Sequence, residues 1–529
     1  MATERWRRLI REASWAAAAL AVAVVAAVAT VGASYRKELQ SDDVAQLLAL
    51  RSWRESGLSR FYVGSDTLLL RAPLSWLLDL LVPPGPRQLR LLTGLLGAFT
   101  ALLLVAAVRW QARGSRAVAL VGGLAAAWVV ANPGVAEAIG RPLVRNIELG
   151  AAMLGLVALD RLVAQRPRRP LLVLPAVAVG LSALLWDDPY LTYLAAIPAA
   201  VLCLLSAAIA RSGWRALVSL SLLAGIAGSR ALDGLAGLVG IEVLAAPIEL
   251  LELHQYEDAR RAAIDQSPLA FGVSGRPAAG VGVAVAWGNR VALVVLAAAV
   301  VVAAVAVLRR FRAVPVGTAV AVLLVPLPLA GWVASSNVLF EYSWRYLVLT
   351  PFALAMLVPT ALAALPSRLR TVALVVVGAT LAVAVAGNLQ LAGRRLDCGE
   401  RCTPVPAAVK VAEDTSLAGA LEPAGVTKLF APYWRANIAV YQTDGAVTAV
   451  AVACEDGQVV ARRWLITEVT FTKPTATSHL LFEAGKVAGC DRAMVERQLG
   501  PPLQIEVVGG AELWSYQGDL AQRLPSVTR

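Results

Sequence analysis

The sequence is poor in charged residues and in histidine. Only 16% of its 529 residues are charged, and the chain has two histidines, His254 and His479. It contains no glycine-rich loop of the P-loop type, no H-E-x-x-H and no G-x-S-x-G. An ATP-driven or zinc-protease mechanism therefore has no support in the sequence.

Apolar residues dominate instead. Hydrophobic residues make up 58% of the chain, and the mean hydropathy is +0.66. Runs of about twenty apolar residues recur, which is the length a helix needs to cross a bilayer core of about 30 Å. A spanning β-barrel would alternate in polarity. We therefore predict a polytopic α-helical membrane protein with about eleven transmembrane helices, at residues 13–33, 91–110, 117–132, 147–164, 170–186, 191–210, 216–232, 290–308, 313–333, 346–365 and 371–388.

The net charge of +12 has a simple topological interpretation. Basic residues gather in short segments between apolar runs rather than on one extended face, which indicates cytoplasmic loops and not nucleic-acid binding. The N-terminus is then inside, the C-terminus is outside, and the first span is retained rather than cleaved as a signal peptide. Arginine outnumbers lysine, which suggests a high-GC bacterial genome. We expect a multi-pass protein of the bacterial plasma membrane.

The longer polar segments all face outward under this topology. Residues 1–393 form the predicted membrane domain, with outer loops at 34–90 and 233–289, and residues 394–529 form an extracytoplasmic α/β or α+β domain. The first loop should contain a helix from Asp42 to Ser56 and an amphipathic helix in "TLLLRAPLSWLLDLLV" that lies on the bilayer surface. In the tail we expect strands that include "TKLFAPYW", "ANIAVYQT" and "SHLLFEA".

Cysteine usage agrees with an outward-facing tail. Cys203 lies within a span, and the other four cysteines all lie in the tail. An even number in an oxidising compartment predicts two disulfides. Three pairings are possible, and we favour Cys398–Cys402 with Cys454–Cys490. Metal binding by "CGERC" is disfavoured by the oxidising compartment and the scarcity of histidine.

Two acidic pairs follow predicted spans on the outer side. Asp42 and Asp43 follow Ser41, and the simplest interpretation is a capped helix start with acids in the first turn. Because adjacent helical residues diverge by about 100°, the two carboxylates cannot have the same role. Asp187 and Asp188 lie in a tight turn before a proline, which explains one aspartate more easily than two.

Three arginines depart from the basic-inside pattern. Arg141 and Arg145 lie in "GRPLVRNIE", and Arg345 opens a late span in "SWRYLVLTP". They can snorkel to the interface or pair with Glu148 or Glu341. Alternatively, their guanidinium groups bind a lipid phosphate through a bidentate fork.

Together these features resemble the GT-C superfamily, the multi-spanning glycosyltransferases that use polyprenyl-phosphate-linked sugars. The likeness lies in an outer loop with an acidic pair after the first span, a second acidic outer turn, an arginine at the start of a late span, and an outer domain that contains "YWRAN". Many relatives have histidine near the second acidic site or in the first loop, whereas neither place has one here. Metal dependence therefore stays open.

The resemblance implies an inverting transfer from a polyprenyl-phosphate-linked sugar donor to a glycan or protein acceptor. The general base is Asp42 or Asp43, and Arg345 holds the donor phosphate with Arg145 and Arg141. The other implied positions serve the acceptor. Asp187, Asp188 and Asp66 position acceptor hydroxyls or hold a divalent cation (Mg²⁺ or Ca²⁺), and Tyr433, Trp434 and Trp464 stack on sugar rings, with core packing as the simpler role of these aromatics.

Two other functions stay open on the sequence alone. A transporter or lipid flippase would also explain the many spans, although internal repeats are absent and the polar loops are concentrated on one face. A non-catalytic subunit of an envelope-assembly complex would keep the scaffold and tolerate loss of Asp42 and Asp43.

Overall fold

The computed structural model divides the chain into two compact units. The helical unit contains Met1–Tyr35, Thr93–Leu232 and Pro247–Cys402. The second, mixed unit contains Arg36–Leu92, Asp233–Ala246 and Thr403–Arg529, so that the first predicted outer loop and the tail belong to one unit. The structure describes residues 2–35, 41–56, 61–64, 70–112, 114–141, 145–244, 249–274, 282–309, 315–340, 343–398, 416–463, 471–508 and 510–527.

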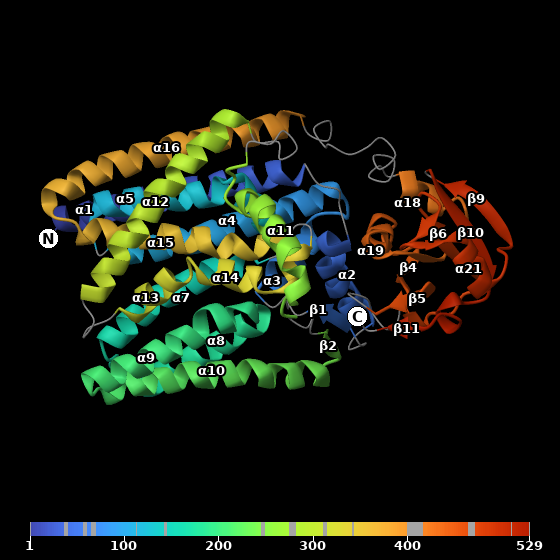
Figure 1. The fold of residues 1–529 in the computed structure, drawn as a ribbon, viewed down its shortest axis with the longest axis horizontal. Helices are drawn as coiled ribbons and strands as arrows, with labels where there is room; N and C mark the ends of the chain where they lie inside the picture. The colour runs from blue at the N-terminus through green and yellow to red at the C-terminus, as the bar shows by residue number, and fades with distance from the viewer. Residues whose placement is uncertain are drawn as a thin grey trace. The chain divides into compact units, whose positions relative to one another are not determined.

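Long apolar helices make up the helical unit (Figure 1). Within the described ranges, nine are long and apolar enough to cross a membrane, and they coincide with nine of the eleven predicted spans. They are compatible with a multi-pass membrane protein. These nine are Glu12–Ser34, Pro86–Gln111, Pro170–Asp187, Thr192–Ala210, Gly213–Leu238, Val283–Arg309, Val316–Val333, Ser343–Ala364 and Ser367–Cys398.

The remaining two predicted spans depart from a simple apolar helix. The first is broken, because α5 (Arg116–Ala131) and α6 (Pro133–Ile139) meet at 70°. Asn132 stands at the break, where its side chain accepts a hydrogen bond from the Gly134 amide and caps α6. The second is α7 (Ile147–Ala164), a complete helix that carries charged residues at both ends.

Helix α15 (Leu349–Ala364) forms the centre of the helical unit, and almost all of its side chains are buried. Figure 1 shows α8, α9 and α10 side by side, and serine hydroxyls of α10 bond to backbone carbonyls of α8 and α9. Helices α4 (Pro86–Gln111) and α10 (Gly213–Leu238) belong to this unit except for residues 86–92 and 233–238, which belong to the second unit. The other elements of the unit are α1 (Ala2–Ser34), α5, α6, α7, α8 (Pro170–Asp187), η1 (Thr192–Ala196), α9 (Ile197–Ala210), η2 (Leu253–Gln255), α11 (Tyr256–Ala270), α12 (Val283–Arg309), α13 (Val316–Leu323), α14 (Leu327–Val333), η5 (Ser336–Leu339), η6 (Ser343–Val348), α15 and α16 (Ser367–Cys398).

A mixed seven-stranded sheet is the centre of the second unit (Figure 1). Its order is β11-β5-β4-β3-β6-β10-β9, with β3 parallel to both β4 and β6. The prediction of an α/β tail is confirmed. The sheet strands are β3 (Lys428–Pro432), β4 (Thr448–Glu455), β5 (Gln458–Arg462), β6 (Thr477–Phe482), β9 (Gln504–Val508), β10 (Ala511–Gln517) and β11 (Ser526–Val527), and a short pair is formed by β7 (Lys486–Val487) and β8 (Cys490–Asp491).

The two faces of this sheet are covered by different helices. Along β3, Leu429 and Ala431 pack in one apolar cluster with α18 (Ser416–Leu421) and α19 (Tyr433–Gln442). Phe430, which points to the opposite face, packs in a cluster with α21 (Arg492–Leu499). This alternation follows from the period of two in a strand.

The strand predicted for "ANIAVYQT" is wrong, because these residues lie in α19. The alternating pattern resembled a strand, but Ala436 and Ala439, three residues apart, both pack in the cluster with β3 and β4. That spacing places both side chains on one face of a helix. The cysteine prediction is confirmed for Cys454–Cys490. Cys398 is also disulfide-bonded, and Cys402 lies outside the described residues.

The first predicted outer loop forms α2 (Ser41–Ser56), β1 (Phe61–Gly64) and α3 (Ala72–Leu81), and β1 pairs in parallel with β2 (Ile241–Leu244). Both segments predicted to be helical contain a helix, the second over Ala72–Leu81, and its position on a bilayer surface stays a prediction. The exposed side chains of α3 are apolar, as an interfacial helix requires, with Trp76 and Leu80 each half exposed and Leu81 70% exposed.

A polar cluster joins α2 and α3 to the tail within this unit. Arg51 of α2 donates two hydrogen bonds to Asp79 of α3 at 2.6 and 2.8 Å, and one to Asp444, which follows α19. The hydroxyl of Tyr441 in α19 donates to Gln88 at 2.6 Å and accepts from the Gly85 amide at 2.9 Å. Gln88 in turn donates to Asp79. The first loop is therefore bonded to α19 and to the residue Asp444 after it by both charged and neutral side chains.

Candidate functional site

The site begins at the turn between α8 and η1. Asp187 is the last residue of α8 and Asp188 is its C-cap, and both are buried. One Asp188 oxygen accepts the Tyr190 amide at 3.1 Å, which closes an Asx turn, and Pro189 prevents α8 from continuing. The chain turn therefore holds the Asp188 carboxylate in a fixed orientation.

Arg145 reaches this carboxylate from the start of α7. Its Nε donates to both Asp188 oxygens, at 2.7 and 2.8 Å, and the two side chains are 11% and 1% exposed. The helix start beside it is tightly organised. Asn146 caps α7 by accepting the Ile147 amide, and Glu148 accepts the Asn146 amide at 2.8 Å. Arg145 was predicted to bind the donor phosphate, and Asp188 was predicted to position the acceptor. In the structure the two residues form an ion pair with each other.

Two tyrosines enclose this ion pair. The Arg145 guanidinium lies 4.3 Å from the ring centroid of Tyr190 and 5.1 Å from that of Tyr346. The two rings are 5.7 Å apart. Tyr346 belongs to η6, which is anchored by Ser343, a residue that accepts the Trp332 indole N–H and bonds to Gln266 of α11. Three separate segments therefore meet around Arg145.

Arg345 joins the same group from η6. Its guanidinium lies 5.8 Å from the Tyr346 ring centroid, so Tyr346 has an arginine on its own element and another from α7. Among the described residues, Arg345 has no carboxylate partner, in contrast to Arg145. The structure thus brings together Arg145, Asp188 and Arg345, which are far apart in the sequence.

The tyrosine hydroxyl of Tyr190 is the other unusual polar group here. It is buried and has no hydrogen-bond partner within the part of the chain that the structure describes. Burial, with smaller contributions from the Asp188 and Tyr346 charges, raises the pKa of Tyr190 to about 12 against the opposing effect of Arg145. Tyr190 therefore stays protonated and acts as a hydrogen-bond donor, not as a base, near neutral pH.

The other predicted residues lie elsewhere or outside the described part. Arg141 is half-buried, and its carbonyl accepts a hydrogen bond from Asn146. Asp42 and Asp43 are the second and third residues of α2, but their side chains lie outside the described residues, as do Asp66 and Trp464.

The remaining aromatic candidates lie at the start of α19. Tyr433 and Trp434 contact each other edge to face at 4.8 Å, and Trp434 is half exposed. An exposed indole in this position is open to a planar ligand face. For the residues with described placement, no group of three or more histidine, cysteine, aspartate or glutamate side chains is placed to hold a metal ion.

Neither a scan of protein-family models nor a search of curated proteins finds a match to this chain. The functional argument therefore depends on the site itself. Sequence reasoning missed the role of Tyr190 and Tyr346, although both stand inside the motifs that it singled out, "WDDPY" and "SWRY". Both tyrosines stand next to charged residues that were candidates for the site, and this proximity is the signal that could have identified them.

Chemically, this arrangement favours an anionic ligand. It has a guanidinium that pairs with no carboxylate of the described residues (Arg345), a neutral phenol donor (Tyr190) and a second guanidinium fixed in place by a buried carboxylate (Arg145). Charged groups at the ends of apolar helices are costly to bury and commonly mark ligand sites. A phosphate monoester or diester provides the oxygens that these donors require.

Proposed function

We propose that this protein is a membrane glycosyltransferase of the GT-C type, which moves a sugar from a polyprenyl-phosphate donor to an acceptor hydroxyl on the outer face of the membrane. The observation that carries the proposal is the contrast between two arginines at one tyrosine ring. Arg145 is bound to buried Asp188, whereas Arg345 has no carboxylate partner among the described residues.

This contrast supports different roles for the two arginines. Arg345 is the ligand of the donor phosphate, since no carboxylate in the described part of the chain compensates its charge. Arg145 is a positioning residue that holds the Tyr190 and Tyr346 rings, and its pairing with Asp188 reduces the net charge that it offers to a phosphate. The Tyr190 hydroxyl is a second donor to the phosphate or to the sugar.

The chemical step needs a base for the acceptor hydroxyl. Asp42 or Asp43, at the start of α2, takes the hydroxyl proton while the oxygen attacks the anomeric carbon and the bond to the phosphate breaks, with inversion. The phosphate leaves with the bonding electrons, and Arg345 stabilises the charge that develops on it. Proton transfer of this kind contributes roughly 10²–10⁴-fold to the rate.

The test is donor turnover by the full chain in nanodiscs, with a panel of radiolabelled polyprenyl-phosphate sugars and an envelope extract as acceptor. We expect Arg345→Gln to lower kcat/KM about 100-fold with an increased KM for the donor, since a charged hydrogen bond is lost. Asp42→Asn or Asp43→Asn should lower kcat and leave donor binding intact.

Arg260→Gln is the matched control. Arg260 is an exposed arginine of α11 that pairs with Glu257, and its replacement should leave turnover unchanged. If no donor of the panel is consumed, or if Arg345→Gln and both aspartate variants turn over like the wild type, the glycosyltransferase proposal fails. Transport or a scaffold role would then be the better explanation.

A further inference from the structure

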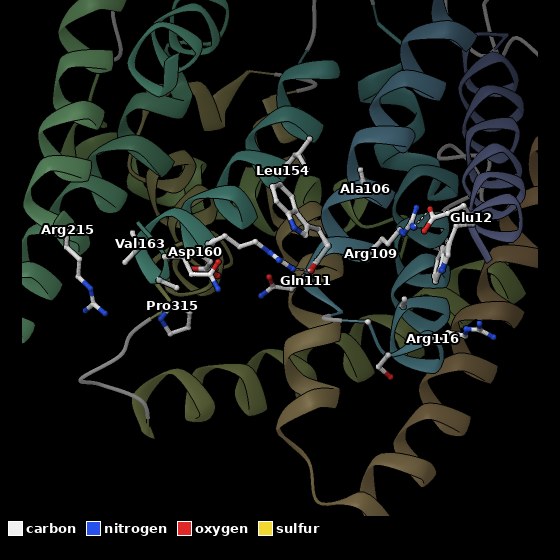
Figure 2. A pocket seen from close by; sticks show the side chains of 18 residues that line it. Glu12, Ala106, Arg109, Gln111, Arg116, Leu154, Asp160, Val163, Arg215 and Pro315 are labelled. Atoms are coloured by element: carbon white, nitrogen blue, oxygen red, sulfur yellow. Dashed lines mark hydrogen bonds and ion pairs between the residues drawn. The ribbon is translucent and has the colours of Figure 1, made fainter. Parts of the chain in front are cut away.

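A large cavity lies at the end of the helical unit where the short basic connections are found. Its volume is about 1150 Å³, somewhat larger than a typical small-molecule pocket. The last turns of α4 and α7 line it together with the first turns of α5 and α10, Pro315 before α13, and residues of α1 (Figure 2). It thus collects side chains from six parts of the unit.

Arginine is the dominant charged residue of this cavity. Four arginines line it (Arg109, Arg116, Arg161 and Arg215), against two acidic residues. Both acidic residues already have partners. Glu12 forms an ion pair with Arg109 at 2.6 Å, and Asp160 accepts the Gly317 and Thr318 amides and the Thr318 hydroxyl at the start of α13. The cavity therefore has an excess of positive charge.

Two of the arginines are held in place without being neutralised. Arg161 donates to the Trp110 carbonyl at 3.1 Å and lies over the Trp110 ring, and Arg215 donates to the Ser206 hydroxyl at 2.5 Å. In the described part of the chain, neither forms an ion pair with a carboxylate. Figure 2 shows Asp160 between Arg215 and Gln111. Neutral acceptors thus fix the two guanidinium groups and leave their charge available.

We propose that this cavity binds the phosphate of an anionic phospholipid head group. Guanidinium groups bind phosphate oxygens through short, charge-assisted hydrogen bonds. The remaining lining favours a lipid over a soluble anion, because Trp15 and Trp110 line the same cavity with aliphatic side chains such as Leu154 and Val163. Tryptophan is the aromatic residue typical of the boundary between head groups and acyl chains, and basic pockets between spans bind lipid head groups.

This lipid site is separate from the candidate donor site. Arg145 and Asn146 precede the first residue of α7, whereas Asp160, Arg161 and Val163 are in its last turns. A helix of this length separates its ends by about 25 Å at 1.5 Å per residue. The inference therefore does not depend on the proposed glycosyl transfer, and it assigns a lipid of the opposite leaflet to the predicted cytoplasmic end.

The test is a binding titration of the delipidated full chain in neutral detergent. The probes are dioctanoyl phosphatidylglycerol, dioctanoyl phosphatidylcholine and inorganic phosphate, each followed by microscale thermophoresis. We expect the double variant Arg161→Gln/Arg215→Gln to weaken the Kd for phosphatidylglycerol about tenfold or more, as loss of charge-assisted hydrogen bonds predicts. Arg168→Gln removes an exposed charge of the α7–α8 connection outside the cavity, and should change that Kd less than about twofold.

A further variant keeps the test decisive if the double variant does not fold. Arg116 lines the cavity, is exposed and forms no ion pair among the described residues, so Arg116→Gln should fold normally and weaken binding about threefold. The proposal is overturned if the cavity variants bind phosphatidylglycerol like the wild type, or if Arg168→Gln weakens binding as much as they do. It is also overturned if inorganic phosphate binds as tightly as the lipid, since the site would then serve a soluble anion.

Discussion

The ion pair between Arg145 and Asp188 should be among the most strongly coupled pairs in the helical unit. Breaking a buried pair by removing one partner typically costs 3–5 kcal/mol, roughly, because the other charge stays buried without compensation. The Asp188 side chain is 1% exposed and that of Arg145 is 11% exposed, so little water can replace either partner. Coulomb's law gives about 4 kcal/mol for unit charges about 4 Å apart at an effective dielectric constant of about 20.

The two single variants should not be equally costly. Asp188→Asn keeps an oxygen that can accept the Tyr190 amide, so the turn after α8 is preserved. Arg145→Met also removes the guanidinium from the two tyrosine rings, which adds about 0.5–2 kcal/mol of lost cation–π energy. We therefore expect Arg145→Met to be the more destabilising variant.

A double-mutant cycle measures the coupling. The free energy of unfolding is obtained from hydrogen exchange of the α7 and α8 amides as the SDS fraction of mixed micelles is raised, which isolates the helical unit. We expect Arg145→Met/Asp188→Asn to be less destabilising than the sum of the single variants, with a coupling energy of about 2–4 kcal/mol.

The pair Glu257–Arg260 on α11 is the control, because it is an exposed pair at i, i+3 and should show no resolvable coupling. If the two cycles give the same result, Arg145 and Asp188 are effectively solvated. The assignment of Arg145 as a positioning residue would then be wrong.

The second unit allows three further predictions. Tyr441→Phe removes the hydroxyl that bonds Gln88 and the Gly85 amide, and should destabilise the unit by about 1–3 kcal/mol, measured as faster hydrogen exchange in α3 and α19. Cys454→Ser opens a disulfide loop with a sequence separation of 36 residues, and the chain-entropy model predicts a loss of about 4 kcal/mol in the free energy of unfolding. Unchanged hydrogen exchange of the β4 amides would contradict this prediction. Burial lowers the pKa of His479 in the folded state below its usual value of about 6.5, so the unfolded chain binds the proton more readily. The contribution of neutral His479 to the free energy of unfolding should therefore be complete above about pH 6.5, and it should be lost as the pH falls toward the lower pKa of the folded state. Exchange of β6 amides, corrected for intrinsic rates, should show this loss between pH 7.5 and 5.5 and show less of it in His479→Gln.

The long apolar helices were predictable because a run of about twenty apolar residues, the length needed to cross a bilayer, can be recognised locally in each of them. The bend at Asn132 could not be predicted in this way, because the apolar run continues through it. Helix α5 ends there only because Asn132 caps α6 and Pro133 begins it. Helix α19 was mistaken for a strand for a related reason. Its short alternating pattern fits either period, and only packing of Ala436 and Ala439 against the sheet decides between them.

The candidate site shows the same division between local and non-local information. Charged residues at the ends of apolar runs were recognisable from the sequence, and Arg145, Asp188 and Arg345 were all identified. Their relation was not, because the predicted partners of the arginines were Glu148 and Glu341, nearby in sequence. The observed pair joins residues 43 positions apart and depends on how α7 packs beside the turn after α8.

The polar cluster of the second unit changes the role that the tail can have. Arg51 lies on α2, about two and a half turns after the candidate base at Asp42 or Asp43, and it is bonded to Asp79 and to Asp444, which follows α19. A domain that only recruited an acceptor would have no need of such bonds to the first loop. The Arg51 side chain is largely buried, and its bond to Asp444 joins α2 to the residue segment after α19. The tail is therefore part of the support of the proposed catalytic loop, and deleting it should abolish turnover even with a soluble acceptor that the tail does not bind.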